Sequence, residues 1–287
     1  MTHAVAEYPR RFAALVKFEH TVFALPFAYV GAFLALDAVP SASQITWLTL
    51  AMVGARSLAM ALNRLIDARI DARNPRTAGR ELPSGLLKPW HVVLFSLASL
   101  AIFLVAVWHL DPVVRYLWPI PVAMFVVYPY LKRATWLCHA WLGAVDGLAP
   151  VGGWVAVTGK LPLEAWLLGG AVAVWVAGFD LLYAIFDVEV DRAQRLHSFP
   201  ARFGMPATFV AARVLHAATV LLLALAGLWL DANVFYWLGV AAVGALLAYE
   251  HSLVSPSDLR RLDAAFFTMN GVISVVFLVF VLLDVVA

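Results

Sequence analysis

Residues 59–71 read AMALNRLIDARID, an apolar helical run that ends in polar side chains. An α-helix turns about 100° per residue, so Asn63, Asp67 and Asp71 fall on one stripe of this helix. Arg56, seven positions before Asn63, extends the same stripe. Neighbouring carboxylates repel each other unless a cation lies between them, and Mg²⁺ binds through one or two carboxylates, water and phosphate oxygens. The stretch therefore predicts a membrane-spanning helix whose end carries a magnesium site.

A second stretch repeats this pattern. Residues 180–191 read DLLYAIFDVEVD and close another apolar run. On a regular helix Asp180, Tyr183, Asp187 and Asp191 share one face. One such stripe is also typical of a solvated helix terminus, but two of them, each continuous with a membrane span, favour a functional site. If the two helix ends face one cavity, they can hold two cations and a diphosphate.

Composition places the chain among polytopic membrane proteins. Of its 287 residues 63% are hydrophobic and 13% charged, and the mean hydropathy is +0.87. The single cysteine, Cys138, excludes a disulfide framework or a cysteine metal cluster. We expect no cleavable signal peptide, because Arg10, Arg11 and Lys17 precede a long apolar run that has no small-residue cleavage site. We expect the chain to lie in a lipid bilayer and to bind no nucleic acid.

Nine apolar runs have the length of a membrane span, about 17–25 residues. In lipid a helix satisfies its own backbone hydrogen bonds, so each run is expected to be helical. We predict an all-α fold, a polytopic membrane bundle of nine transmembrane helices that forms a single domain over residues 1–287. The runs are 20–38, 45–66, 91–109, 113–131, 135–158, 163–186, 207–229, 233–253 and 264–286.

The order of the runs indicates an internal duplication. Spans one to four (about 20–131) and five to eight (about 135–253) each carry an acidic stripe at the end of their second helix. We predict two four-helix pseudo-repeats, followed by the final helix 264–286. An even number of helices per repeat makes the repeats parallel, whereas inverted repeats are typical of many transporters.

Basic residues gather in alternate loops. The loops after the second, fourth, sixth and eighth spans are rich in them, whereas the other loops hold only Arg115 and Lys160. By the positive-inside rule the N-terminus and both acidic helix ends face the cytoplasm, which places the protein in the inner (cytoplasmic) membrane. The basic residues of these loops are Arg69, Arg73, Arg76, Arg80, Lys88, Lys132, Arg133, Arg192, Arg195, Arg202, Arg260 and Arg261.

These parts suit the ionisation of an allylic diphosphate. Mg²⁺ and nearby basic groups would stabilise the departing pyrophosphate, and the apolar bundle would accept an isoprenoid tail. Intramembrane tyrosines can stabilise an allylic cation through their ring faces. Asp146 lies inside the fifth span, where a carboxylate is either part of an acceptor pocket or makes a structural hydrogen bond.

Several of these stretches resemble one family. Residues 63–71 (NRLIDARID), with 76–80 (RTAGR) and 82–85 (LPSG), resemble the first signature of the UbiA-type intramembrane aromatic prenyltransferases. Residues 180–191 resemble their second signature, and residues 128–133 (YPYLKR) resemble the element that follows their fourth span. The likeness covers nearly the whole chain, in order, and is greatest to the 4-hydroxybenzoate polyprenyltransferase branch.

The resemblance implies a Mg²⁺-dependent transfer of a polyprenyl group from its diphosphate to a ring carbon of an aromatic acid, in ubiquinone or menaquinone biosynthesis. By match to the motifs, four aspartates would be catalytic and, with Asn63, would hold the metal: Asp67, Asp71, Asp187 and Asp191. Basic residues would contact the diphosphate: Arg76, Arg80, Lys132, Arg133 and His197. The acceptor pocket or central cavity would be lined by Arg56, Tyr128, Asp146, Asp180 and Tyr183. The family commonly has Asp after the first Asn, where this chain has Arg64.

Three alternatives remain at this point. The acceptor could be a hydroxynaphthoate of menaquinone synthesis in place of a 4-hydroxybenzoate. The chain could belong to relatives that prenylate haem, a chlorin or a glycerol phosphate. From a different class, a cation-coupled secondary transporter could use Asp146 and Asp180, although both acidic stripes gather at one membrane face and not at the midplane.

Overall fold

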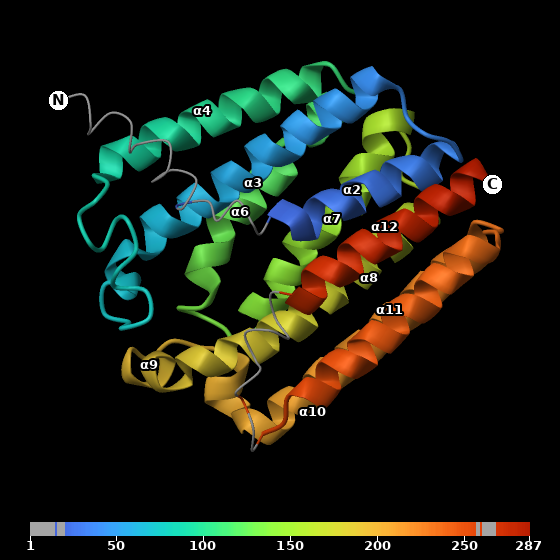
Figure 1. The fold of residues 1–287 in the computed structure, drawn as a ribbon. Helices are drawn as coiled ribbons and strands as arrows, with labels where there is room; N and C mark the ends of the chain where they lie inside the picture. Colours follow the sequence, from blue (N-terminus) through green and yellow to red (C-terminus); the bar gives the residue numbers. More distant parts are fainter. Residues whose placement is uncertain (1–14, 16–20, 257–258, 260–267) are drawn as a thin grey trace.

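The computed structural model describes residues 15, 21–256, 259 and 268–287, and no strand occurs among them. The chain forms a bundle of long helices whose order is shown in Figure 1. The helices are α2 (Thr21–Leu36), α3 (Ala42–Asp71), α4 (Pro89–Trp108), α5 (Val114–Leu117), α6 (Pro119–Leu131), α7 (Cys138–Thr158), α8 (Leu163–Tyr183), η2 (Ala184–Asp187), α9 (Val188–Ala193), α10 (Phe199–Trp229), α11 (Val234–Leu253) and α12 (Asn270–Val286).

The prediction of an all-α membrane bundle is confirmed. Within the described residues, nine helical segments correspond to the nine predicted spans, α5 and α6 together forming the fourth. Of the helices that the structure describes, six are long and apolar enough to cross a membrane, and two further apolar helices are shorter. The first residue of the predicted span 20–38, the start of the span 264–286, and Arg10, Arg11, Lys17, Arg260 and Arg261 lie outside the described residues.

Two helices depart from the predicted spans. The fourth span is divided at Trp118, where α5 ends and Pro119 opens α6, because proline cannot donate the backbone hydrogen bond that would continue a helix. α10 begins at Phe199, before the predicted start at residue 207, and bends at Gly204. Gly204 has φ 81°, a backbone conformation that favours glycine.

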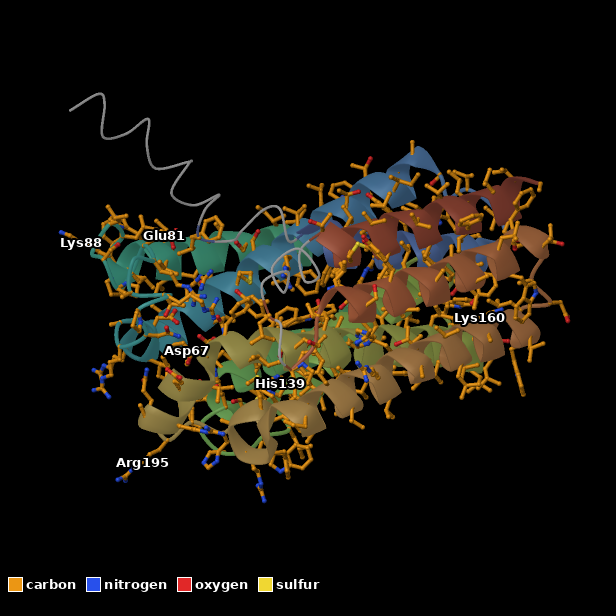
Figure 2. The ribbon with its side chains drawn as sticks, turned by 60° about the horizontal axis from the view of Figure 1, so that its bottom comes forward. Asp67, Glu81, Lys88, His139, Lys160 and Arg195 are labelled. Carbon is orange, nitrogen blue, oxygen red and sulfur yellow. The ribbon has the colours of Figure 1, made fainter. Side chains whose placement is uncertain are left out.

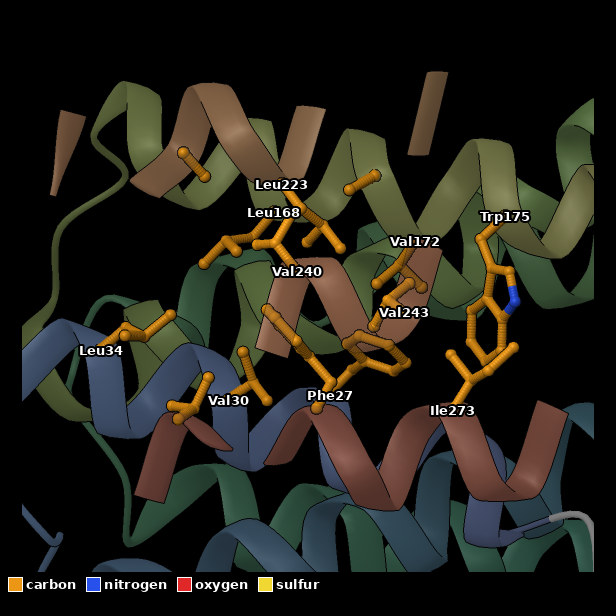
Figure 3. Close-up of a cluster of buried hydrophobic side chains, with 14 of the residues drawn as sticks. Phe27, Val30, Leu34, Leu168, Val172, Trp175, Leu223, Val240, Val243 and Ile273 are labelled. Atoms are coloured by element: carbon orange, nitrogen blue, oxygen red, sulfur yellow. The ribbon is translucent and has the colours of Figure 1, made fainter. Parts of the chain in front are cut away.

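The core joins helices from both ends of the chain. In Figure 3, Phe27 and Val30 of α2 and Ile273 of α12 face side chains of α8, α10 and α11. The rings of Phe27 and Trp175 have centroids 5.1 Å apart. Lipid tails are as apolar as these side chains, so close packing supplies much of the stabilisation between membrane helices.

Glycines allow a close backbone approach between α2 and α7. A Cβ atom added to Gly31 would lie 2.0 Å from the carbonyl oxygen of Pro150, and one added to Gly153 would lie 2.0 Å from that of Ala28. Small residues at such crossings let two membrane helices touch. This contact fixes the first helix of one predicted repeat against the first helix of the other.

Both acidic helix ends emerge at the same end of the bundle. Figure 1 shows the loop that follows α3 and the short helix α9 at this end. In Figure 2, Asp67, Glu81, Lys88 and Arg195 gather there, whereas Lys160 lies at the opposite end. The two predicted repeats also share helix contacts: α3 packs on α4 as α8 packs on α10, and α2 on α3 as α7 on α8. The duplication itself stays a prediction.

Candidate active site

The first acidic helix end is regular through its last turn. α3 runs unbroken to Asp71, so the four-residue spacing holds and the Asn63 side chain donates a hydrogen bond to Asp67, 3.4 Å away. The other oxygen of Asp67 accepts from Arg133 at 2.7 Å. Arg80 binds both oxygens of the buried Asp71 at 2.8 Å.

The second acidic helix end is not one regular helix. α8 stops at Tyr183, a 3₁₀ turn covers Ala184–Asp187, and α9 then begins. A 3₁₀ turn has about three residues per turn, so the predicted common face of a single α-helix is not kept through this segment. Asp180 and Tyr183 line the central cavity, whereas Asp187 and Asp191 each meet a basic residue from the first half of the chain.

Asp187 is held by three polar groups from the loop after α3. The Arg76 guanidinium donates two hydrogen bonds to it, from Nε to Oδ1 at 3.0 Å and from Nη2 to Oδ2. The side-chain amide of Asn74 donates to the same Oδ1 at 2.8 Å. The third nitrogen of Arg76 donates to the Tyr183 hydroxyl at 2.6 Å. Arg76 therefore connects the aspartate to the wall of the cavity.

Asp191 is the most buried of the four aspartates, with 1% of its surface exposed. Its Oδ1 lies 2.7 Å from the Lys132 ammonium. Its Oδ2 is buried and has no hydrogen-bond partner in the part of the chain that the structure describes. A buried carboxylate oxygen without a partner is costly, and it is suited to bind a cation.

Each of the four aspartates thus meets a different basic residue. Burial lowers the pKa of the Lys132 ammonium, but the Asp191 carboxylate outweighs this effect, so the pKa ends above its usual value. Burial likewise lowers the pKa of Arg76, and hydrogen bonding to Asp187 raises it above its usual value. Both groups are therefore cations at neutral pH, available to bind phosphate.

Further hydrogen bonds join the two acidic helix ends to each other and to the segment that follows α6. The Gln194 side chain donates to the carbonyl oxygen of Ile70 at 3.3 Å, and Arg133 donates to that of Ile66 at 2.9 Å. The backbone amide of His197 donates to the Lys132 carbonyl at 2.7 Å, and the His197 side chain is exposed. His197 therefore lies beside the predicted site through its backbone.

A central cavity of about 190 Å³ lies behind the ion pairs. Its wall is polar toward the acidic helix ends and apolar farther in, where Val172, Trp175 and Phe179 contribute. Arg56 and Asp146 line it as a pair, with Nη1 and Oδ1 3.6 Å apart. The predicted site residues that line it are Arg56, Asn63, Arg80, Tyr128, Asp146, Asp180 and Tyr183.

A second cavity of about 210 Å³ shares Arg56 and Asp146 with the first. It lies mainly among α3, α4, α5, α6 and α7, with Ala24 of α2 and Trp166 of α8 also in its wall, and its remaining lining side chains are apolar. Residues that line both spaces are Ala24, Arg56, Ala59, Phe125, Val145 and Asp146. An apolar chamber thus adjoins a polar one at a single ion pair.

Arg64, at the position where the resembling family commonly has Asp, also lines the central cavity. Only 5% of it is exposed, and its Nε donates to the Leu15 carbonyl at 3.4 Å. It adds a positive charge to the wall beside Arg80 and Tyr183.

Sequence reasoning missed three residues near this site: Asn74, His139 and Gln194. Asn74 had a usable signal, because Asn three residues beyond a helix end often closes a turn through its side chain. Its Oδ1 does accept the Arg76 amide at 3.0 Å. His139 and Gln194 act through contacts to distant segments, which no local pattern encodes.

The described residues contain no group of three or more His, Cys, Asp or Glu side chains placed to hold a metal ion. Mg²⁺ does not need such a cage, since it usually takes one or two carboxylates and fills its shell with water and substrate phosphate. The aspartate oxygens at the mouth of the cavity, including the unpartnered Oδ2 of Asp191, have the chemistry that this ion prefers.

Comparison with known proteins shows which family the chain resembles in sequence. Residues 24–272 match the UbiA prenyltransferase family. The 4-hydroxybenzoate octaprenyltransferase of Chromohalobacter salexigens is 30% identical over 246 residues, covering 85% of this chain and 82% of the relative. That of Tolumonas auensis is 31% identical over 245 residues, covering 85% of each chain.

Solved structures show the same fold. The apo structure of a UbiA homolog from Aeropyrum pernix K1 has a TM-score of 0.84 at 31% identity, covering 93% of this chain and 98% of that one. A UbiA homolog from Archaeoglobus fulgidus, bound to GPP and Mg²⁺, has a TM-score of 0.75 at 19% identity. The match covers 96% of this chain and 100% of that one. With its fold, its sequence match and its paired acidic helix ends, this chain belongs to the UbiA prenyltransferase family.

Proposed function

We propose that this prenyltransferase moves a polyprenyl group from its diphosphate to a ring carbon of an aromatic acid of the 4-hydroxybenzoate type, with Mg²⁺, in quinone biosynthesis. The observation that carries the proposal is the set of four aspartate–cation pairs at the mouth of a cavity that becomes apolar farther in. This arrangement supplies both metal ligands and phosphate ligands at one place.

The residues of the four ion pairs would bind the diphosphate group of the substrate. Asn63 and the four aspartates would hold the magnesium, which neutralises charge on the leaving pyrophosphate when bound. The basic partners already lie beside these aspartates and would bind the phosphate oxygens, with planar guanidinium groups suited to two-point contact. They are Arg76, Arg80, Lys132 and Arg133, with His197 at the edge.

The prenyl tail would lie in the apolar chamber among α3 to α7. Transfer of isoprenoid carbons from water to such a lining is favourable in free energy. Tyr128 and Tyr183 line the central cavity between the chamber and the ion pairs. Their rings would stabilise the allylic cation that forms when the bond between C1 and the diphosphate oxygen breaks.

The acceptor would bind at Arg56 and Asp146. The guanidinium of Arg56 faces the central cavity and is suited to the carboxylate of an aromatic acid. The similar proteins of Chromohalobacter salexigens and Tolumonas auensis are named for 4-hydroxybenzoate, which carries such a carboxylate. The new carbon–carbon bond forms at the ring, and loss of the ring proton restores aromaticity.

The membrane placement is part of the proposal. The chain is an integral multi-pass membrane protein. The basic loops lie with the acidic helix ends, and basic loops favour the cytoplasmic side. We therefore place the site at the cytoplasmic face of the inner membrane, where a water-soluble aromatic acid can reach it.

The test is an assay of the purified protein with geranyl diphosphate, Mg²⁺ and a panel of hydroxybenzoates and hydroxynaphthoates. We expect a C-prenylated hydroxybenzoate that appears with Mg²⁺ and disappears with a chelator. A prenylated hydroxynaphthoate as the sole product would move the acceptor to the menaquinone branch. Absence of any prenylated aromatic product would overturn the proposal.

A further inference from the structure

His139 connects two elements that are distant in the sequence. It is the second residue of α7 and is buried, with 4% of its surface exposed. Its Nδ1 lies 2.7 Å from Oδ2 of Asp180 on α8, and its Nε2 lies 3.2 Å from the backbone nitrogen of Phe199 at the start of α10. Figure 2 shows His139 nearer to the end that carries Asp67 than to Lys160.

The two contacts fix the protonation of the ring. A backbone amide can only donate, so Nε2 must accept from Phe199 through its lone pair. The ring proton is then on Nδ1, where it donates to Asp180. In this arrangement His139 is neutral, and a second proton on Nε2 would remove the bond to Phe199.

The bond to Phe199 also caps a helix. The first amides of a helix have no partner within it, and the N-cap residue Ser198 makes no side-chain capping bond. The imidazole of His139 takes the place of that cap. The position of the ring is therefore determined by α10 as well as by α8.

A neutral donor affects a carboxylate differently from a cationic one. Asp146 lines the same cavity and faces Arg56, whose positive charge cancels its own. Among the described residues, Asp180 accepts a hydrogen bond from the ring of His139, which this tautomer leaves uncharged, so the bond orients the carboxylate without adding a positive charge. Its Oδ1 makes no hydrogen bond within the described residues, so this oxygen is not committed to the protein.

We propose that His139 is a positioning residue that orients the Asp180 carboxylate at the wall of the central cavity, toward the place where the allylic cation forms. The inference rests on the proposed function, in which that cation forms in this cavity. A carboxylate that is already oriented toward the developing positive charge stabilises the transition state and so speeds the reaction.

The activity test compares substitutions at His139. His139→Phe keeps a ring but loses both bonds, and kcat should fall by about 10–100-fold, the usual effect of losing a hydrogen bond to a charged group, with the KM for geranyl diphosphate unchanged. His139→Gln can donate to Asp180 and accept from Phe199, so it should recover most of kcat. His109→Gln, at an exposed histidine beyond α4, is the matched control and should match wild type. Wild-type kcat in His139→Phe, or equal losses in the Phe and Gln variants, would overturn the proposal.

A second measurement does not depend on activity. Solid-state NMR of protein labelled with ¹⁵N-histidine in bilayers can assign His139 by the signals missing from His139→Gln. We expect a protonated Nδ1 and a bare Nε2, whereas a doubly protonated ring or a proton on Nε2 alone would overturn the assignment. If the wild type prenylates no aromatic acid, the proposed function fails, and these spectra still decide how His139 holds Asp180.

Discussion

The two acidic helix ends carry similar residues but are built differently. The first is the last part of the unbroken helix α3, whereas a 3₁₀ turn divides the second between α8 and α9. The basic residues that pair with them are not divided between the two halves in the same way. The basic residues paired with the four aspartates all come from the first half of the chain: Arg76, Arg80, Lys132 and Arg133.

The basic residues that follow the second acidic stretch do not take the corresponding roles. Arg192, Arg195 and Arg202 are exposed and form no ion pair within the described part of the chain. Both halves of the chain therefore carry acidic residues of similar spacing, whereas the first half supplies the basic residues that pair with them. The comparison shows that the repeated sequence pattern locates the carboxylates of the site but not the basic residues that pair with them.

The largest expected effect tests whether both acidic ends are needed. Asp67→Ala and Asp187→Ala should each lower kcat by at least about 10²–10³-fold, because each removes a metal ligand at the leaving pyrophosphate. Lys160→Ala, at the opposite end of the bundle, is the control. Prenyl transfer at saturating Mg²⁺ measures the effect, and full activity in either aspartate variant would mean that the two ends do not share one site.

The next largest effect tests whether the basic residues of the first half, and not those of the second, bind the diphosphate. Arg76→Ala and Lys132→Ala should lower kcat/KM for the prenyl diphosphate by about 10–100-fold, since each removes a charge-assisted contact to phosphate. Arg192→Ala and Arg202→Ala remove equal charge from the second half and should leave kcat/KM unchanged. Equal losses in both sets would show that general positive charge, and not these four pairs, binds the diphosphate.

A smaller effect concerns how the halves are held together. Gly153→Ala places a methyl group against the Ala28 carbonyl of α2, and it should reduce stability by about 1–3 kcal/mol, the usual cost of overpacking. Gly152→Ala is a matched control one residue away, where an added Cβ meets nothing within 4 Å. Thermal unfolding in detergent compares them. A Gly153→Ala variant as stable as Gly152→Ala would contradict the tight α2–α7 contact.

These regions also show what a sequence can predict. The apolar runs and the four-residue spacing of Asn63, Asp67 and Asp71 are local patterns, so the helices and the first acidic stripe follow from them directly. The 3₁₀ turn at Ala184–Asp187 does not, because residues AIFD have no strong local preference for it. It lies where Asp187 meets Arg76 and Asn74, a contact between segments more than 100 residues apart.

The residues of the central cavity also differ in how far the sequence alone predicts them. An intramembrane carboxylate such as Asp146 stands out in an apolar run and was predicted to line an acceptor pocket or make a hydrogen bond. His139 did not stand out, since a single histidine near the start of a span has no periodic partner. Its importance comes from Asp180 and Phe199, which reach it only after α7, α8 and α10 have packed.

The smallest expected effect concerns the link between the second acidic end and the cavity. Tyr183→Phe removes the hydroxyl that accepts from Arg76 at 2.6 Å and keeps the aromatic ring, whose face lies 4.9 Å from the guanidinium carbon. Arg76 keeps its two contacts to Asp187, so kcat/KM should fall only a few-fold, about the worth of one hydrogen bond. Tyr249→Phe, at an exposed tyrosine of α11, is the control. A loss as large as that of Arg76→Ala would mean that the Tyr183 hydroxyl, and not Asp187, determines where Arg76 lies, and the cross-half ion pair would lose its central place in the site.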